Sequence, residues 1–159
     1  RGGELIDIAL IDAVISKDLF IGSKAIWNMD SIEKIIVTRS HPASIGFSSL
    51  VGCKKTIYPE DDFGAFVDIN SGSQMIKAAI AAGVVESIGV SEPVILGFED
   101  EYEFIAQDRG IIALDGEREI EFSKDHKFIF KVRRTGPFHV DVSKALETAQ
   151  LNGFFIIKN

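Results

Sequence analysis

The chain has 159 residues, of which 46% are hydrophobic and 26% are charged, and its formal net charge is −7. This length suits one domain with a proper core, and the composition excludes a disordered protein. The acidic balance argues against a protein that binds a nucleic-acid backbone, which would need a basic face. No apolar run approaches the ~20 residues that span a bilayer, and no signal peptide is visible, so we expect no membrane partner.

Cys53 is the single cysteine, so a disulfide framework is excluded and a reducing, cytoplasmic compartment is expected. The sequence starts at Arg1 without a methionine, and its first residues already have the pattern of a strand. We therefore expect residues 1–159 to form a single β-rich domain that something precedes in a longer protein.

The first third of the chain predicts two strands and one short helix. Leu5 to Ile15 is apolar except for Asp7 and Asp12, which is typical of a strand buried on both faces. Asp12 then needs a partner or a ligand, because an unpaired buried carboxylate is costly, although a bulge or a strand end would also explain it. Asp18 to Trp27 predicts a short helix, and Ile32 to Thr38 predicts a strand.

A segment rich in small residues follows, from Arg39 to Gly52. Pro42 can occupy the first turn of a helix that Gly52 would end. Such a helix start presents free N–H groups and lets a ligand approach the backbone, although many helix starts of this kind bind nothing. His41, beside the proline, is expected to be a turn residue.

From Lys54 onward, short apolar runs separated by turn residues predict β structure. The expected strands are Thr56 to Tyr58, Ala65 to Ile69, Val84 to Val90, Val94 to Leu96, Tyr102 to Ala106 and Lys127 to Val132. Asn70 to Ser73 is expected to be a loop. Met75 to Ala82 fits either a helix that ends at Gly83 or a strand.

The stretch from Gly110 to Phe122 predicts a β-hairpin. Its Asp115-Gly116 pair lies between two strand-like runs, and glycine accepts a positive φ without steric cost. Asp115, Glu117 and Glu119 are thereby crowded at one turn. These carboxylates mark either a solvated hairpin tip or the rim of a site, and Lys127 to Val132 is expected to pair with the hairpin.

The C-terminal region predicts an amphipathic helix. Its apolar residues recur at helical spacing, at Val142, Ala145, Leu146 and Ala149. Ser143 or Asp141 would cap its start and Gly153 its end, and Phe154 to Ile157 is expected to be a final strand. With the apolar face packed on the strands, the chain would be a mainly β (α+β) sandwich or barrel with a few short helices.

Sequence motifs for common catalytic and metal sites are not found. The three histidines, His41, His126 and His139, are scattered, and none has the spacing of a zinc site. The isolated glycines form neither a P-loop nor a dinucleotide fingerprint.

Three stretches together resemble the ATP-NAD kinase family, in the branch that contains the acetoin catabolism protein AcoX. They are Gly110 to Phe122, Thr38 to Gly52, and Gly136 to Val142. The resemblance covers nearly the whole chain and implies an NAD-kinase-like C-terminal β-sandwich. It also implies a strand at Met75 to Ala79, and a preceding nucleotide-binding domain with a Gly-Gly-Asp-Gly-Thr motif, which does not occur in this sequence.

The same resemblance implies two groups of site residues. The family's Asn-Glu or Asn-Asp pair corresponds to Ile11-Asp12, which keeps only the acid. The family's Gly-Ser-Thr-Ala-Tyr corresponds to Ala43 to Phe47, which keeps a serine and an aromatic residue. Asp12, Ser44, Gly46 and Phe47 would bind the acceptor substrate, and Asp115 and Glu117 would be catalytic at an interdomain cleft.

In function, the resemblance implies the substrate-binding domain of an ATP-NAD kinase-like phosphotransferase, inactive without its N-terminal domain. NAD or a related acceptor would be phosphorylated by ATP with Mg²⁺, and folding would require no cofactor. The expected partners are the N-terminal domain and further copies of the same chain. The competing hypothesis is a non-catalytic nucleotide-sensing or oligomerisation domain, which apolar surface left over from the core would favour.

Overall fold

The computed structural model describes residues 4–17, 29–136, 138 and 140–157, and the described chain is mainly β, as predicted. The strands are β1 (Asp12–Ser16), β2 (Ile32–Val37), β3 (Phe63–Ala81), β4 (Val84–Val90), β5 (Val94–Gly97), β6 (Tyr102–Ile105), β7 (Gly110–Leu114), β8 (Arg118–Phe122) and β9 (Lys127–Phe130). The helices are η1 (Met29–Ser31), α1 (Phe47–Gly52) and α2 (Val142–Leu151). The helix expected at Asp18 to Trp27 lies outside the described residues.

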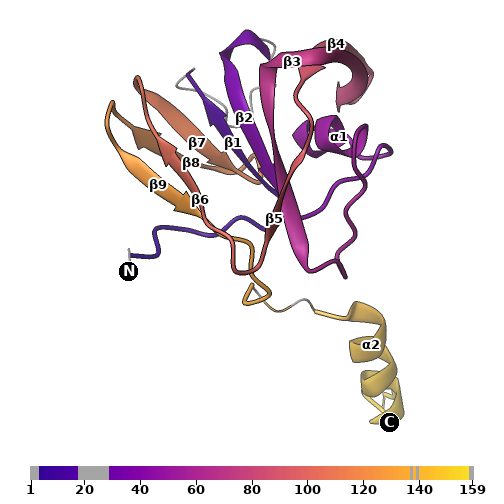
Figure 1. Cartoon of the computed structure of the whole chain (residues 1–159). Coiled ribbons are helices and arrows are strands. Elements are labelled where there is room, and N and C mark those ends of the chain that lie inside the picture. Colours follow the sequence, from indigo (N-terminus) through magenta and orange to yellow (C-terminus); the bar gives the residue numbers. More distant parts are fainter. Residues whose placement is uncertain (1–3, 18–28, 137, 139, 158–159) are drawn as a thin grey trace.

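Seven strands form one antiparallel sheet in the order β4-β3-β2-β1-β7-β8, with β5 also paired to β3. β6 and β9 pair in a separate two-stranded sheet. Helix α1 lies on one side of the large sheet and the β6–β9 pair lies on the other (Figure 1).

The central strands β1 and β7 are buried because both faces of the sheet are covered. One apolar cluster, on the α1 side, contains Val14, Ile35, Val67, Ile111, Leu50 and Val51. A second cluster, on the β6–β9 side, contains Ile15, Ile36, Ile112, Leu114, Phe104 and Phe122. The apolar runs of these strands therefore match burial on two faces, which the sequence analysis predicted for Leu5 to Ile15 and which holds for its β1 part.

The strand expected from Leu5 begins only at Asp12. The neighbouring strands have no residues left to pair with earlier positions, since Val37 pairs with Asp12 and Leu114 pairs with Ala13. Residues 4–8 and 10 are exposed, so the expected two-sided burial is wrong for this part of the chain.

The segment after β2 also differs from its prediction. Helix α1 begins at Phe47 rather than near Pro42, and Gly46, its N-cap, has a φ of 107°. Gly52 is the last helical residue and does not act as the expected stop. A Cβ there would lie 2.4 Å from the carbonyl of His41, so glycine is required for close packing. Ile57 forms an isolated bridge with Ser40, and no strand is formed around it.

Residues 70–73 continue β3 instead of forming the expected loop. Ile69 and Gln74 both pair with Val90, and Asn70 has a φ of 59°. The polar residues between them thus lie at an irregularity that redirects the strand without ending it. Met75 to Ala82 is mostly strand, as the family resemblance implied.

Strand β9 pairs with β6 and not with the hairpin. The turn before it is tied to the end of β6, because the N–H of Ala106 donates to the carbonyl of His126 (2.9 Å) and that of Asp125 donates to Ala106 (2.8 Å). The aromatic rings of Phe104, Phe122 and Phe128 then pack between the two sheets.

Helix α2 forms where the apolar spacing predicts it, with Asp141 as its N-cap. The expected packing is wrong, because none of its residues is buried. The strand expected at Phe154 to Ile157 is also wrong, since these residues are exposed and form a turn and an irregular end. Within the described part of the chain, no helix is long and apolar enough to cross a membrane.

The burial pattern predicts which truncations destabilise the fold. Ile15 is fully buried, so Ile15→Ala should lower the free energy of unfolding by about 2–5 kcal/mol. Leu146 is 53% exposed, so Leu146→Ala should change it by less than about 0.5 kcal/mol in this chain. Urea denaturation of both variants measures the difference, and equal losses would contradict the exposed position of α2.

Candidate functional site

The predicted hairpin is present, and its turn presents Asp115. Strands β7 and β8 pair from Gly110 with Phe122 to Leu114 with Arg118. Asp115 and Gly116 both have positive φ, 53° and 69°, and the N–H of Glu117 donates to the carbonyl of Leu114 (3.0 Å). Aspartate and glycine tolerate this left-handed backbone better than most residues do, so the local sequence explains the turn.

The carboxylate of Asp115 binds the backbone that leads into β1. Its Oδ2 accepts the N–H of Leu10 (2.7 Å), and its Oδ1 accepts those of Ile11 (2.7 Å) and Asp12 (3.2 Å). The N–H of Asp115 donates in return to the carbonyl of Asp12 (3.0 Å). Hydrogen bonds to an ionised carboxylate are among the stronger ones in proteins. Asp115 therefore fixes the position of Asp12.

Asp12 is the titratable group that this arrangement perturbs. It shares its face of β1 with Val14 of the α1-side cluster, and it is partly buried. Burial, and secondly the charge of Asp115, raise the pKa of Asp12 from 3.8 to about 6. A carboxyl group with a pKa near neutrality can accept and release a proton under physiological conditions, a property that is common at functional sites.

Two residues that the sequence analysis did not single out complete this region. The hydroxyl of Thr38 donates to the carbonyl of Leu10 (2.6 Å), and its N–H donates to that of Ile11 (2.9 Å). Arg118 forms an ion pair with Asp7 and donates to the carbonyl of Ile8 (2.6 Å). These contacts join positions far apart in the sequence, so no local pattern could have identified them.

The other predicted residues have different surroundings. Glu117 is exposed in the turn beside Asp115. Ser44, Gly46 and Phe47 lie together at the start of α1, where the N–H of Ser44 donates to His41 and that of Gly46 donates to Ala79 (2.9 Å each). The structure thus brings Asp12 and Asp115 together, with Glu117 in the same turn, and places the other expected acceptor-binding residues, Ser44, Gly46 and Phe47, in a separate segment.

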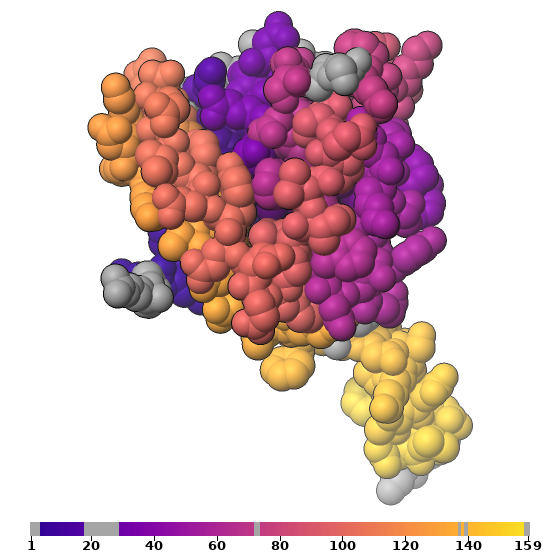
Figure 2. Space-filling model, in the orientation of Figure 1, coloured from indigo at the N-terminus to yellow at the C-terminus, as the bar shows by residue number. Residues whose placement is uncertain are grey.

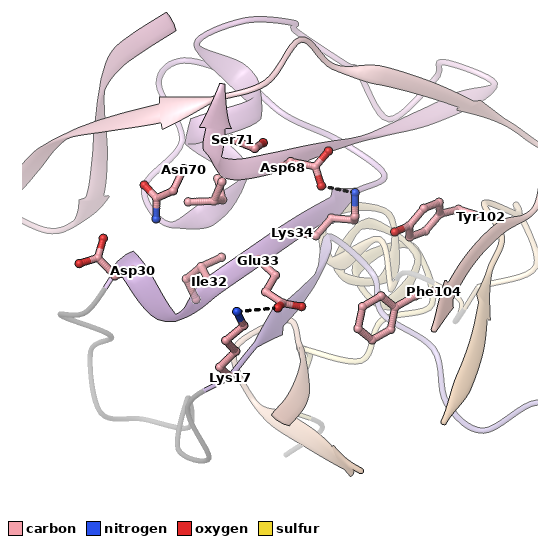
Figure 3. A pocket seen from close by; sticks show the side chains of 11 residues that line it. Lys17, Asp30, Ile32, Glu33, Lys34, Asp68, Asn70, Ser71, Tyr102 and Phe104 are labelled. Carbon is pink, nitrogen blue, oxygen red and sulfur yellow. Dashed lines mark hydrogen bonds and ion pairs between the residues drawn. The ribbon is translucent and has the colours of Figure 1, made fainter. Parts of the chain in front are cut away.

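An open pocket of about 490 Å³ lies at the end of the β1–β2 pair that is farther from Asp12. Figure 3 shows Lys34 of β2 pointing toward Asp68 of β3, with Tyr102 of β6 nearby. Lys34 forms an ion pair with Asp68, and its Nζ lies 4.4 Å from the ring centroid of Phe66 and 4.9 Å from that of Tyr102. Burial raises the pKa of Tyr102, while the nearby Lys34 opposes this rise.

None of the predicted site residues lines this pocket. The sequence pattern that could have indicated this pocket is a charged residue inside each of two apolar runs, Lys34 in β2 and Asp68 in β3. These two residues are directly paired in the strand register, and their charges compensate one another. We therefore regard the Asp12–Asp115 pair as the candidate functional site.

The donor set of this site does not fit Mg²⁺. Both carboxylate oxygens of Asp115 accept backbone N–H groups, so Asp12, which is partly buried, is the remaining acid of the pair that could bind a cation. No group of three or more His, Cys, Asp or Glu side chains within the described ranges could hold a metal ion. Nucleotide phosphates and Mg²⁺ would thus require ligands from elsewhere.

Comparison with known proteins identifies the family. The model of the acetoin catabolism protein X C-terminal domain family matches residues 1–135. The chain belongs to this family. It is also 31% identical over 152 residues to acetoin catabolism protein X of Cupriavidus necator. The similarity covers 94% of this chain but only 42% of that relative, and no solved structure matches.

The match to the acetoin catabolism protein X C-terminal domain includes the large sheet, α1 and the Asp12–Asp115 pair. Helix α2 begins at Val142, after the last matched residue. The candidate site is thus part of the family's shared domain.

The raised pKa of Asp12 predicts that stability depends on pH. The folded chain binds this proton more tightly than an ordinary aspartate does, so the resulting stabilisation is present below about pH 4 and is lost as the pH rises through about 6. Asp12→Asn removes the effect. We therefore compare the free energy of unfolding of the variant with that of the wild type at two pH values. The variant-minus-wild-type difference should be larger at about pH 7.5 than at about pH 4, by on the order of 1–3 kcal/mol. Urea denaturation at both pH values tests this, and a constant difference would mean that Asp12 has an ordinary pKa.

Proposed function

We propose that this chain is the acceptor-binding domain of a phosphotransferase that resembles ATP-NAD kinases. In this proposal, the domain has the NAD-kinase-like sandwich fold and acts with a nucleotide-binding domain in the full-length protein. The acceptor is NAD or a related hydroxyl compound. The observation that carries the proposal is the Asp12–Asp115 pair, a partly buried acid with a pKa near 6 held beside a carboxylate that is fixed by backbone N–H groups.

Asp12 has the protonation behaviour that the acceptor half of this reaction needs. Above pH 6 its carboxylate is mostly ionised and can accept the proton that an acceptor hydroxyl loses as its oxygen bonds to phosphorus. ATP would supply the phosphoryl group, and its bond to the ADP leaving group would break in the same transfer. Positioning and charge stabilisation provide most of the catalysis in such reactions.

Asp115 acts in this proposal as a positioning residue for Asp12. Its carboxylate oxygens are engaged by the N–H groups of residues 10–12, which fix the start of β1. Exposed Glu117, in the same turn, is free to reach a substrate or the nucleotide-binding domain. The start of α1, with Ser44, Gly46 and Phe47, would contact the rest of the acceptor.

The decisive test is Asp12→Asn in the full-length protein. Turnover, measured as ADP released from ATP with NAD as acceptor, should fall by about 10²-fold or more, because the amide cannot accept the proton. The urea midpoint at about pH 7.5 should not fall, since the variant removes an ionised group that is partly buried.

Asp108→Asn provides the matched control, because it makes the same acid-to-amide change at an exposed residue between β6 and β7. It should keep wild-type rates. Wild-type rates for Asp12→Asn in an active protein would remove the pair from the mechanism. They would favour the non-catalytic nucleotide-sensing alternative for this domain.

A second prediction distinguishes a catalytic role of Glu117 from a structural role of Gly116 in the turn. Glu117→Gln should lower turnover by about 10²-fold with an unchanged urea midpoint, if the exposed carboxylate reaches the reacting groups. Gly116→Ala should keep the turnover and lower the free energy of unfolding by about 1 kcal/mol, because φ at Gly116 is 69°. Full activity of Glu117→Gln would restrict the site to Asp12 and Asp115.

A further inference from the structure

The chain reaches Asp12 through a segment that is largely exposed. Residues 4–8 and 10 are exposed. In the space-filling view, the indigo start of the chain lies on the outside of the molecule, below the orange strands (Figure 2). Strand β1 begins only at Asp12, which pairs with Val37. The position of Asp12 therefore depends on what holds the residues immediately before it.

The N–H groups of these residues converge on one acceptor. Asp115 accepts the N–H groups of Leu10 and Ile11 (2.7 Å each) and that of Asp12 (3.2 Å). In a regular strand, successive N–H groups point to opposite edges, so this convergence means that the backbone here departs from strand geometry. Side chains therefore take the place of a neighbouring strand as hydrogen-bond partners.

Thr38 holds the carbonyl side of the same residues. Its hydroxyl donates to the carbonyl of Leu10 (2.6 Å), and its N–H donates to that of Ile11 (2.9 Å). Thr38 directly follows β2, whose last residue, Val37, is the strand partner of Asp12. Two elements therefore hold the peptide groups just before Asp12: the hairpin turn binds their N–H groups, and the end of β2 binds their carbonyls.

Thr38 is uncharged, and its hydroxyl bonds a backbone carbonyl, so its effect on Asp12 is one of position. Burial, and secondly the charge of Asp115, raise the pKa of Asp12. Within residues 7–12, 38–39 and 115–118, the charged side chains are Asp7, Asp12, Arg39, Asp115, Glu117 and Arg118. A substitution of Thr38 by an uncharged residue alters none of these charges. It changes the pKa of Asp12 only if the carboxyl group moves.

We propose that Thr38 is a second positioning residue of the candidate site, which holds the carbonyl side of residues 10 and 11 while Asp115 holds their N–H side. Contacts on both sides fix the peptide groups that lead to Asp12, and with them the direction of its side chain. In the proposed function, this keeps the carboxylate where it meets the acceptor hydroxyl. A displacement of about 1 Å at a reacting group can lower turnover by about 10²-fold.

The inference rests on the proposed function for its effect on turnover, but the position of Asp12 can be tested without activity. Thr38→Val in the 159-residue chain keeps the branched shape and the backbone N–H but removes the hydroxyl. The carboxyl ¹³C signal of Asp12, assigned with Asp12→Asn, is followed by NMR through the titration, which should centre near pH 6 in the wild type. In Thr38→Val the pKa should fall by about 1 or more, because the released carboxyl group becomes more exposed and moves away from Asp115.

Three further variants separate the hydroxyl from other effects of the substitution. Thr38→Ser keeps the hydroxyl and should keep the wild-type pKa of Asp12. Thr38→Ala removes the hydroxyl without adding a methyl group, and it should reproduce the fall. Thr56→Val makes the same change at another half-buried threonine and should leave the pKa of Asp12 unchanged. A merely structural role of Thr38 would lower the urea midpoint but would not move this pKa.

Turnover of the full-length protein separates this inference from the proposed function. With ATP and NAD, Thr38→Val should lower kcat by about tenfold or more with little change in the KM for ATP, and Thr38→Ser should restore most of the rate. An unchanged pKa of Asp12 in Thr38→Val, or an equal fall in Thr56→Val, would overturn the inference. A lowered pKa in a full-length protein whose turnover does not depend on Thr38, or that has no kinase activity, would leave the positioning role intact and reject the proposed role of Asp12.

Discussion

The carboxylate of Asp115 and the three backbone N–H groups that it accepts connect the hairpin turn to the start of the central strand. Leu10 and Ile11 precede the first paired residue of β1, and although Thr38 donates to their carbonyls, their N–H groups would otherwise depend on water. A charged acceptor at this point satisfies these donors together. It also sets the position at which β1 enters the sheet, and with it the position and surroundings of Asp12.

This arrangement makes the ionised form of Asp12 less favourable. Its carboxyl group lies partly buried beside a second acid, and both effects disfavour its charged form. The raised pKa therefore separates Asp12 from the paired charges elsewhere in the fold, such as Lys34 and Asp68, whose opposite charges compensate one another beneath two aromatic rings.

The described chain contains two kinds of structure. One is the large sheet, whose two faces are covered, and the other is helix α2, which has no buried residue. Helix α1 and the β6–β9 pair bury the two faces of β1 and β7, so the sheet region has a complete core of its own. Helix α2 has sound caps at both ends but no core, and its apolar residues face solvent.

Local chemistry in the sequence was sufficient for elements that depend on neighbouring residues. The Asp115-Gly116 turn follows from backbone preferences, and the caps of α2 follow from side chains within a few positions. Asp12 and Asp115 were recognisable as candidate acids from the patterns around them. Long-range contacts decided the rest: the pairing of β9 with β6, the continuation of β3 through residues 70–73 and the short β1. The burial that raises the pKa of Asp12, and its contact with a residue 103 positions away, exist only after the chain has folded, because they depend on strands that no local pattern brings together.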